Sequence, residues 1–127
     1  MKKRNLKKII ACITVIVTLI VISSTVFALP SEIDSFSFIT VTDAAKSSLL
    51  GNGNTSVRTA ATLVNTGVPR EFYYLKVGSR VTGDFLIDGT IRTASLGNFT
   101  AGNYFCVIQK RDPNIGTTMS GWVKIFQ

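Results

Sequence analysis

Short runs of β-branched and aromatic residues, interrupted by Gly, Asn, Asp and Pro, limit the fold of this chain more than any other feature. The runs are five to nine residues long and recur from residue 35 to the C-terminus. No window shows the sustained 3.6-residue spacing of apolar side chains that an amphipathic helix requires. Short, regularly interrupted runs are typical of all-β domains. We therefore predict a two-sheet antiparallel β-sandwich of about six to seven strands over residues 35–127.

Alternation and turn residues place the strands and loops approximately. Residues 43–50 are predicted to form a single helical turn. Asp43 is a good helix cap, and acceptable helix formers follow it. Gly51-Asn52-Gly53-Asn54 is predicted to be a flexible loop, because Gly and Asn tolerate positive φ. The strand at 70–77 carries apolar side chains on both faces and is predicted to be central in its sheet. The other single strands are predicted at 35–42, 56–65 and 121–126, with turns at 66–67 and 112–116.

Two hairpins are predicted from local turn chemistry. Asp88-Gly89 lies between apolar stretches at 84–87 and 90–93, and Asp-Gly adopts the two positive φ angles of a type I′ turn at little cost. This hairpin would set Leu86 opposite Ile91. Ala101-Gly102 is predicted to join a second pair of strands, at 96–100 and 103–110.

The N-terminal residues have the pattern of a secretory signal. Five Lys and Arg fall within residues 1–8, and residues 9–22 are apolar except for two Thr. That apolar run is shorter than the roughly 20 residues of a membrane-spanning helix. We expect a signal-peptide helix in residues 1–28, cleavage between Ala28 and Leu29, and a short linker at 29–34. The alternatives are an uncleaved membrane anchor and, less consistent with its early position, a lipidated Cys12.

Charge and cysteine content narrow the environment and the partners. After residue 28 there are 9 basic and 7 acidic residues, so the remainder has a net charge of only +2. A nucleic-acid partner is therefore not expected, and membrane contact is expected only through the N-terminal segment before its cleavage. Cys106 would be the single cysteine of the cleaved form, which excludes an internal disulfide. Its apolar neighbours predict a buried thiol.

The side chains available for catalysis are few. The chain contains no His, which excludes Ser-His and Cys-His nucleophile pairs and His-containing zinc sites. Asp84 and Asp88 are close in sequence, but four residues of strand would separate them by roughly 13 Å, too far for paired glycosidase carboxylates. Asp112 and Asn114 offer oxygen ligands without the spacing of a calcium loop. We expect no enzyme activity, no cofactor and no metal.

Aromatic side chains are the remaining candidates for a binding site. Rings on a rigid sheet can stack on a sugar or on another protein, and a core this small need not accommodate all of them. The alternative for each ring is a place in the core, where it would bury about 150–250 Å². The candidate binding residues are Tyr73, Tyr74, Tyr104 and Trp122.

Several short motifs carry a resemblance to exported bacterial proteins. Residues 96–107 followed by 120–125 resemble the last strands of many exported β-sandwiches, in which Ala-Gly-x-Tyr opens the penultimate strand. With the further motifs Phe36-Ser37-Phe38 and Val81-Thr82-Gly83, the whole chain is similar to small exported Gram-positive proteins of unknown function. Some of those proteins are encoded near bacteriocin and transporter genes. The resemblance implies export, and no catalytic residue can be carried over from it.

Three functions are compatible with these observations. The first is a secreted or envelope binding protein whose partner is an unknown protein or a cell-wall glycan, with a bacteriocin-like effector as one form of it. The second is a cell-wall or carbohydrate-binding module. The third is a passive structural protein of the envelope. The sequence does not choose among them.

Overall fold

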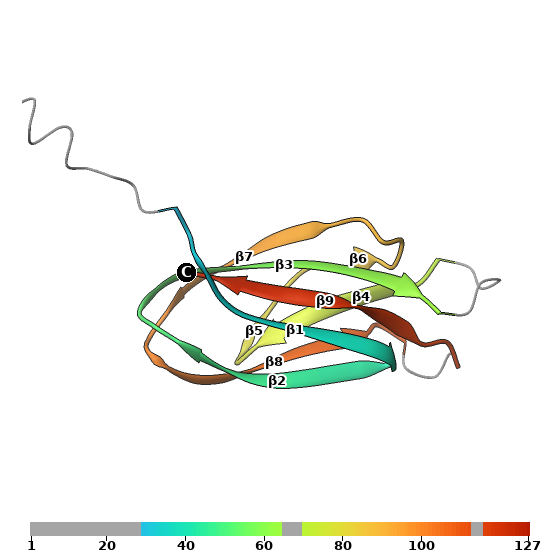
Figure 1. Cartoon of the computed structure of the whole chain (residues 1–127), viewed down its shortest axis with the longest axis horizontal. Coiled ribbons are helices and arrows are strands. Elements are labelled where there is room, and N and C mark those ends of the chain that lie inside the picture. Colours follow the sequence, from blue (N-terminus) through green and yellow to red (C-terminus); the bar gives the residue numbers. More distant parts are fainter. Residues whose placement is uncertain (1–28, 65–69, 113–115) are drawn as a thin grey trace, which may run out of the picture.

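The computed structural model describes residues 29–64, 70–112 and 116–127, and these form a β-sandwich (Figure 1). Nine strands build two antiparallel sheets, and no helix occurs in the described residues. In the same residues, no helical segment has the length and apolar character needed to cross a membrane. The predicted two-sheet all-β fold is confirmed, with two more strands than the upper expectation. The predicted signal-peptide helix lies outside the described residues.

The strands divide between the sheets out of chain order. In sheet A the neighbours are, in order, β1 (Glu32–Val41), β9 (Met119–Phe126), β3 (Gly53–Leu63) and β7 (Arg92–Phe99). Sheet B has the order β2 (Asp43–Leu50), β8 (Gly102–Lys110), β4 (Phe72–Val77) and β5 (Arg80–Val81), with β6 (Phe85–Leu86) also paired to β4. Consecutive strands β1 and β2 therefore lie at edges of different sheets. Strand β4 is interior to sheet B, as its two apolar faces predicted.

The core lies between the sheets and is built by strand alternation. Every second side chain of β9 and β4 points inward, including Val123 and Ile125 in sheet A and Leu75 and Val77 in sheet B, all without solvent exposure. Cys106 of β8 is buried among them. Because successive residues of a strand face opposite sides, the residues between these point outward and form the two outer faces of the sandwich.

The stretch predicted as a helical turn, Asp43–Leu50, is instead strand β2. It pairs along its whole length with β8, from Asp43 opposite Gln109 to Leu50 opposite Gly102. The hydrogen bonds formed along eight paired positions outweigh the modest helix preference of a few Ala and Lys residues. The alternation also gives Lys46 an acidic partner on β1, Asp34.

Neither predicted hairpin forms. Asp88-Gly89 does make a turn, since Gly89 has φ of 79° and the Thr90 amide donates to Asp88 Oδ1 at 2.9 Å. The turn, however, leads from β6 in sheet B to β7 in sheet A, so Leu86 pairs with Phe72 and not with Ile91. Ala101-Gly102 likewise joins β7 to β8, which belong to different sheets. Both turns therefore connect strands of different sheets, whereas a hairpin would have joined neighbouring strands of one sheet.

Several predicted segments lie partly or wholly outside the residues that the structure describes. The leader, the 66–67 turn and residues 113–115 of the 112–116 turn are not described. Strand β1 begins at Glu32, within the stretch expected to be linker, and the Ser31 amide donates to the carbonyl of Gln127 at 2.9 Å. The first described residues therefore run beside the C-terminus. The Gly53 and Asn54 positions of the predicted loop belong to β3.

Candidate functional site

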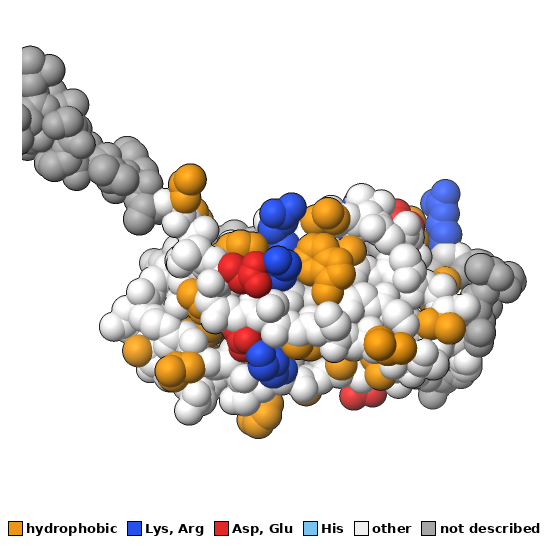
Figure 2. Space-filling model, in the orientation of Figure 1, with side chains coloured by type: hydrophobic (Ala, Val, Ile, Leu, Met, Phe, Trp, Pro, Cys, Tyr) orange, Lys and Arg blue, Asp and Glu red, His pale blue; other side chains and the backbone are white. Residues whose placement is uncertain are grey.

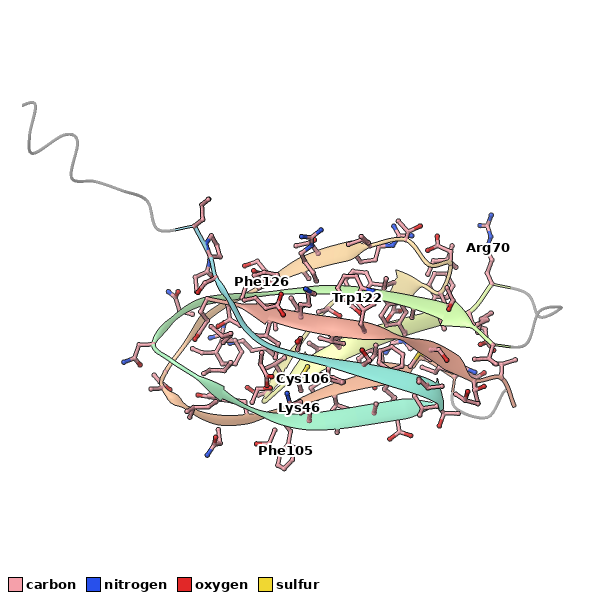
Figure 3. The ribbon with its side chains drawn as sticks, in the orientation of Figure 1. Lys46, Arg70, Phe105, Cys106, Trp122 and Phe126 are labelled. Carbon is pink, nitrogen blue, oxygen red and sulfur yellow. The ribbon has the colours of Figure 1, made fainter. Side chains whose placement is uncertain are left out.

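The outer side of sheet A carries a partly exposed indole surrounded by hydroxyl and basic side chains, which we call the Trp122 face. In Figure 2 hydrophobic, basic and acidic side chains gather over β9 and β1 on the side toward the viewer, and Figure 3 shows Trp122 on the same side. The face comprises Ser35 and Ser37 of β1, Ser120, Trp122, Lys124 and Phe126 of β9, and Ser56, Arg58, Ala60 and Thr62 of β3.

The position of Trp122 follows from the phase of β9. Its neighbour Val123 points into the core and is fully buried, so the indole points outward. From the interior side, the Thr59 hydroxyl donates to the Trp122 carbonyl oxygen at 2.9 Å. This hydrogen bond and the pairing of β9 with strands on both sides hold the backbone under the ring. The indole is therefore mounted on an inner strand of a rigid sheet.

Two depressions border Trp122, one on each side. The first, of about 420 Å³, lies between β1 and β9, where Ser35, Ser37 and Lys124 line it together with the indole. The second, of about 250 Å³, lies toward β3, where Ala60 and Thr62 are part of its lining. Ala60 pairs directly with Trp122, and this small side chain leaves room on that side of the ring. The indole thus separates two hollows across one continuous face.

Hydrogen bonds and one ion pair to neighbouring strands fix several polar side chains of the Trp122 face. The Ser120 hydroxyl oxygen accepts from the Thr40 amide at 2.9 Å, and the Thr62 hydroxyl donates to the Ser120 carbonyl at 3.3 Å. Lys124 Nζ lies 2.7 Å from Glu32 Oε2. The hydrogen bond from Lys124 lowers the pKa of Glu32 below its usual value, so this carboxylate is charged at neutral pH. Both partners remain partly exposed.

The four aromatic candidates take different places. Trp122 is on the outer surface. Tyr73 is 0% exposed and packs edge-on against Phe85 at 5.6 Å between ring centroids, and its burial raises the pKa of its hydroxyl. The proposed binding role of Tyr73 is thus corrected to a core role, because the period-2 phase of β4 points it inward.

Tyr74 and Tyr104 are both partly buried and both have partners. The Tyr74 hydroxyl donates to Gln109 Oε1 at 2.9 Å on the outer side of sheet B, and Arg111 stacks over its ring at 5.5 Å. Tyr104 packs edge-on against Phe99 with centroids 5.1 Å apart, and its hydroxyl donates to the Thr100 carbonyl at 2.9 Å. The structure therefore does not bring the four predicted rings together. Their places on the two sheets leave Trp122 as the center of the candidate site.

Sequence reasoning missed the residues that surround Trp122. Arg58 pairs with Lys124, and Ser37 pairs with Trp122, across strands that are distant in the chain. Alternation within each strand could show that these side chains point outward, but no local signal indicates which strands are neighbors. Of the two residues at the predicted cleavage site, Ala28 lies outside the described residues. Leu29 is described and is largely exposed.

A second polar cluster lies where β8 ends, in sheet B, and is almost entirely inaccessible to solvent. Lys110 Nζ is 3.0 Å from Glu71 Oε2, with side chains 1% and 4% exposed. The Thr117 hydroxyl donates to the same Glu71 oxygen at 2.5 Å, and Lys110 donates to the Thr117 carbonyl at 2.8 Å. These bonds join the end of β8 to the segments preceding β4 and β9. The cluster has a structural role.

Other reactive groups do not assemble in the described residues. Burial raises the pKa of the Cys106 thiol to about 12, which keeps the sulfur protonated and unreactive. Across residues 29–64, 70–112 and 116–127, no three His, Cys, Asp or Glu side chains lie close enough to hold a metal ion together. Asp88 caps its turn and lies 2.9 Å from Arg92, so a structural role accounts for it.

Comparisons with known proteins give structural likeness only. No family model matches the sequence, and no curated protein matches it. A carbohydrate-binding module, CBM36 in complex with calcium and xylotriose, is similar in structure with 18% identity and a TM-score of 0.41, over 78% of this chain and 91% of that chain. A family two carbohydrate esterase from Cellvibrio japonicus has 11% identity and a TM-score of 0.39, over 77% of this chain and 34% of that chain. Likeness at this level does not identify a ligand.

Proposed function

We propose that this chain is a non-enzymatic carbohydrate-binding protein that acts outside the cell, with the Trp122 face as its binding surface. Export is part of the proposal and rests on the basic head and apolar run of residues 1–22. The ligand on this view is a polysaccharide of the cell wall or the surroundings. Binding of this kind requires no catalytic group.

The observation that carries the proposal is the position of the indole between two depressions. A sugar ring presents an apolar face of C–H groups and an edge of hydroxyls, so it is held by an aromatic ring with hydrogen-bonding groups beside it. Trp122 provides that ring, while Ser35, Ser37 and Thr62 provide hydroxyls at its two sides. A ring fixed on a sheet loses little conformational entropy when it binds a ligand.

The open form of the face favours a chain over a single small molecule. Deep sites bury most of a small ligand, whereas here the two hollows are arranged on either side of one ring. A ligand that fills both must cross the indole. We therefore expect the affinity for oligosaccharides to rise with length until both hollows are occupied.

The effector and structural alternatives remain hypotheses without a specific supporting feature. A bacteriocin-like protein would inhibit growth of related bacteria, and a structural protein would do neither that nor bind glycans. Growth assays with purified protein across a strain panel address the first. Inhibition that persists in Trp122→Ala would favour the effector function over glycan binding.

The test is retention on insoluble polysaccharides and purified peptidoglycan. The protein should be retained on at least one of these, and Trp122→Ala should reduce its affinity by at least about tenfold, since stacked aromatic anchors commonly contribute 2 kcal/mol or more to binding. Absence of retention on every polymer, or unchanged affinity of the variant, would contradict the proposal.

The matched control is Phe105→Ala. Phe105 is 66% exposed on the outer side of sheet B, and Figure 3 shows it extending away from Trp122. Both substitutions remove a large ring from a surface, so a general loss of apolar area would affect them alike. Retention should fall only for Trp122→Ala, with both variants keeping the wild-type circular dichroism spectrum.

A further inference from the structure

Two basic side chains are direct cross-strand neighbours on the Trp122 face. Arg58 of β3 pairs in register with Lys124 of β9, and both point outward. Directly opposed residues of antiparallel strands have Cβ atoms about 4.5–5.5 Å apart, and like charges in such pairs are destabilising. The fold therefore places two positive charges together at some cost in stability.

Among the described residues, only one of these two charges has an acidic partner. Lys124 forms its ion pair with Glu32 at 2.7 Å. Arg58 is exposed and makes no ion pair with any described residue. The pair and its carboxylate together keep one positive charge in excess at the surface. A planar guanidinium can bind a carboxylate or phosphate through two parallel hydrogen bonds.

The two cations lie close to the indole along the strands. Arg58 and Lys124 are each two residues along their strands from the paired residues Ala60 and Trp122. Two residues of strand correspond to roughly 6–7 Å. Lys124 and Trp122 also line the same depression, so a ligand in this hollow contacts the ring and Lys124, and it reaches Arg58 by extending across β9 toward β3.

We propose that the ligand of the Trp122 face is an anionic glycan, whose negative group binds at Arg58 and Lys124 while an adjacent sugar stacks on Trp122. This rests on the proposed glycan-binding function and specifies its ligand class. The anionic group is a carboxylate of an acidic sugar or a phosphodiester in a polymer that also carries sugar rings, and both suit the same guanidinium.

A nucleic acid also combines anionic groups with stacking rings, but the charge distribution disfavors it. Nucleic-acid affinity depends on neutralising several phosphates with a patch of Lys and Arg. The chain after residue 28 has a net charge of only +2, and the Trp122 face supplies two cations, of which Lys124 is paired with Glu32. One excess positive charge can pair with a single anionic group beside the ring, but it does not supply the several phosphate contacts on which nucleic-acid affinity depends.

The experiment compares anionic polymers with neutral ones. Calorimetric titrations would use oligogalacturonate against its methyl ester, glucuronoxylan against unsubstituted xylan, and glucose-substituted poly(glycerol phosphate), with single-stranded DNA as a further polyanion. We expect about tenfold tighter binding of at least one anionic glycan than of its neutral counterpart, or binding of the phosphate polymer, because hydrogen bonds to charged groups are the stronger ones. The two sources are separated by which polymer binds.

Arg58→Gln isolates the charge from the stacking. The variant should lose the preference for the anionic polymer, so that its affinities for the charged and the neutral polymer become similar, and the wild-type preference should also weaken as salt is raised. Equal affinity of the wild-type protein for charged and neutral polymers would overturn the anionic ligand while the proposed glycan binding stands. Tighter binding of DNA than of any glycan would overturn this proposal, and no glycan binding at all would overturn both.

Discussion

Gly121 of β9 lies so close to β3 that a Cβ atom built on it would be 2.0 Å from the carbonyl oxygen of Ala60. The same atom would be 2.8 Å from Cζ of Phe38. The contact is needed because β9 is held between β1 and β3 at this point, with Gly121 opposite Phe38 and Ala61. A residue without a side chain is thus required next to the ring that forms the candidate site.

Gly121→Ala should therefore destabilise the protein by about 3 kcal/mol or more, at the high end for overpacking, because the obstacle is backbone and cannot rotate away. Urea unfolding followed by circular dichroism measures this change. Glycan binding should fall as well, since separation of β9 from β3 moves Trp122 relative to Thr62.

The control for that substitution is Gly83→Ala. A Cβ atom on Gly83 meets no atom within 4 Å, and the backbone there is not left-handed. Its stability should be unchanged or raised by up to about 1 kcal/mol, through a smaller unfolded-state entropy. Equal losses in the two alanine variants would contradict the steric argument.

Asp34 joins the edges of the two sheets and should make stability depend on pH. Its carboxylate on β1 accepts hydrogen bonds from Lys46 and Ser48 of β2 and from the Ser35 amide. Partial burial raises the pKa of Asp34, but these hydrogen bonds lower it further, so it lies below the ordinary 3.8. A lowered folded-state pKa stabilises the protein above pH 3.8, and this contribution is lost as pH falls through the folded pKa.

Asp34→Asn should thus be less stable than wild type at pH 7, with a difference that shrinks as the pH is lowered below 3.8. Urea midpoints over pH 2–7 measure it. Ser48→Ala removes one of the same hydrogen bonds, so in the Asp34→Asn background its effect should be smaller than in wild type. A stability difference between wild type and Asp34→Asn that is constant with pH would contradict this assignment.

The buried pair Lys110 and Glu71 should be costly to break from one side. Lys110→Met leaves the Glu71 carboxylate buried with only Thr117 as a described partner, and we expect a loss of about 3–5 kcal/mol. The free energy of unfolding in urea measures the loss.

Replacing both members of the pair distinguishes an uncompensated charge from simple loss of contacts. Lys110→Met with Glu71→Leu fills similar space without charge, so the double variant should be more stable than Lys110→Met alone. A double variant that loses the sum of the two single effects would show that the pair acts through packing.

Cys106 should be unreactive in the folded protein. Burial raises the pKa of its thiol to about 12, with the Asp34 charge as a second cause, so almost no thiolate exists at neutral pH. Maleimide labelling of wild type and Cys106→Ser should be equal under native conditions and differ by one thiol after unfolding in urea. Native labelling of Cys106 would show that this part of the core opens readily.

The sequence was sufficient for the fold class and for the alternation of side chains within several strands. In β9 it separates Val123 and Ile125 from Trp122 and Phe126, but alternation could not decide which side is buried, because both sides carry apolar residues. In β4 it could not decide between Tyr73 and Tyr74, since both phases are apolar. The choice is made by tertiary packing, which places Tyr73 against Phe85.

Turns and cross-strand pairs mark where sequence reasoning stops. Asp88-Gly89 has the local chemistry of a hairpin, but the Gly89 amide donates to the Ala61 carbonyl at 2.8 Å and draws the chain to the other sheet. The neighbours Arg58 and Lys124 are likewise set by the pairing of strands far apart in the chain. Long-range register of this kind has no local signature, so the charged part of the candidate site could not be predicted.

Trp122 is the only Trp of the chain, so its fluorescence reports directly on the candidate site. Because the indole is partly exposed, acrylamide should quench it in the free protein, and a sugar stacked on the ring should shield it and shift its emission. The change should saturate at the ligand concentrations that calorimetry gives.

In Arg58→Gln the same final emission should be reached only at higher concentrations of an anionic glycan, because the ring contact is kept and the charge contact is lost. A glycan that binds by calorimetry and leaves the emission and quenching unchanged would place its site away from Trp122, and the outer side of sheet B around Phe105 would then be the surface to mutate.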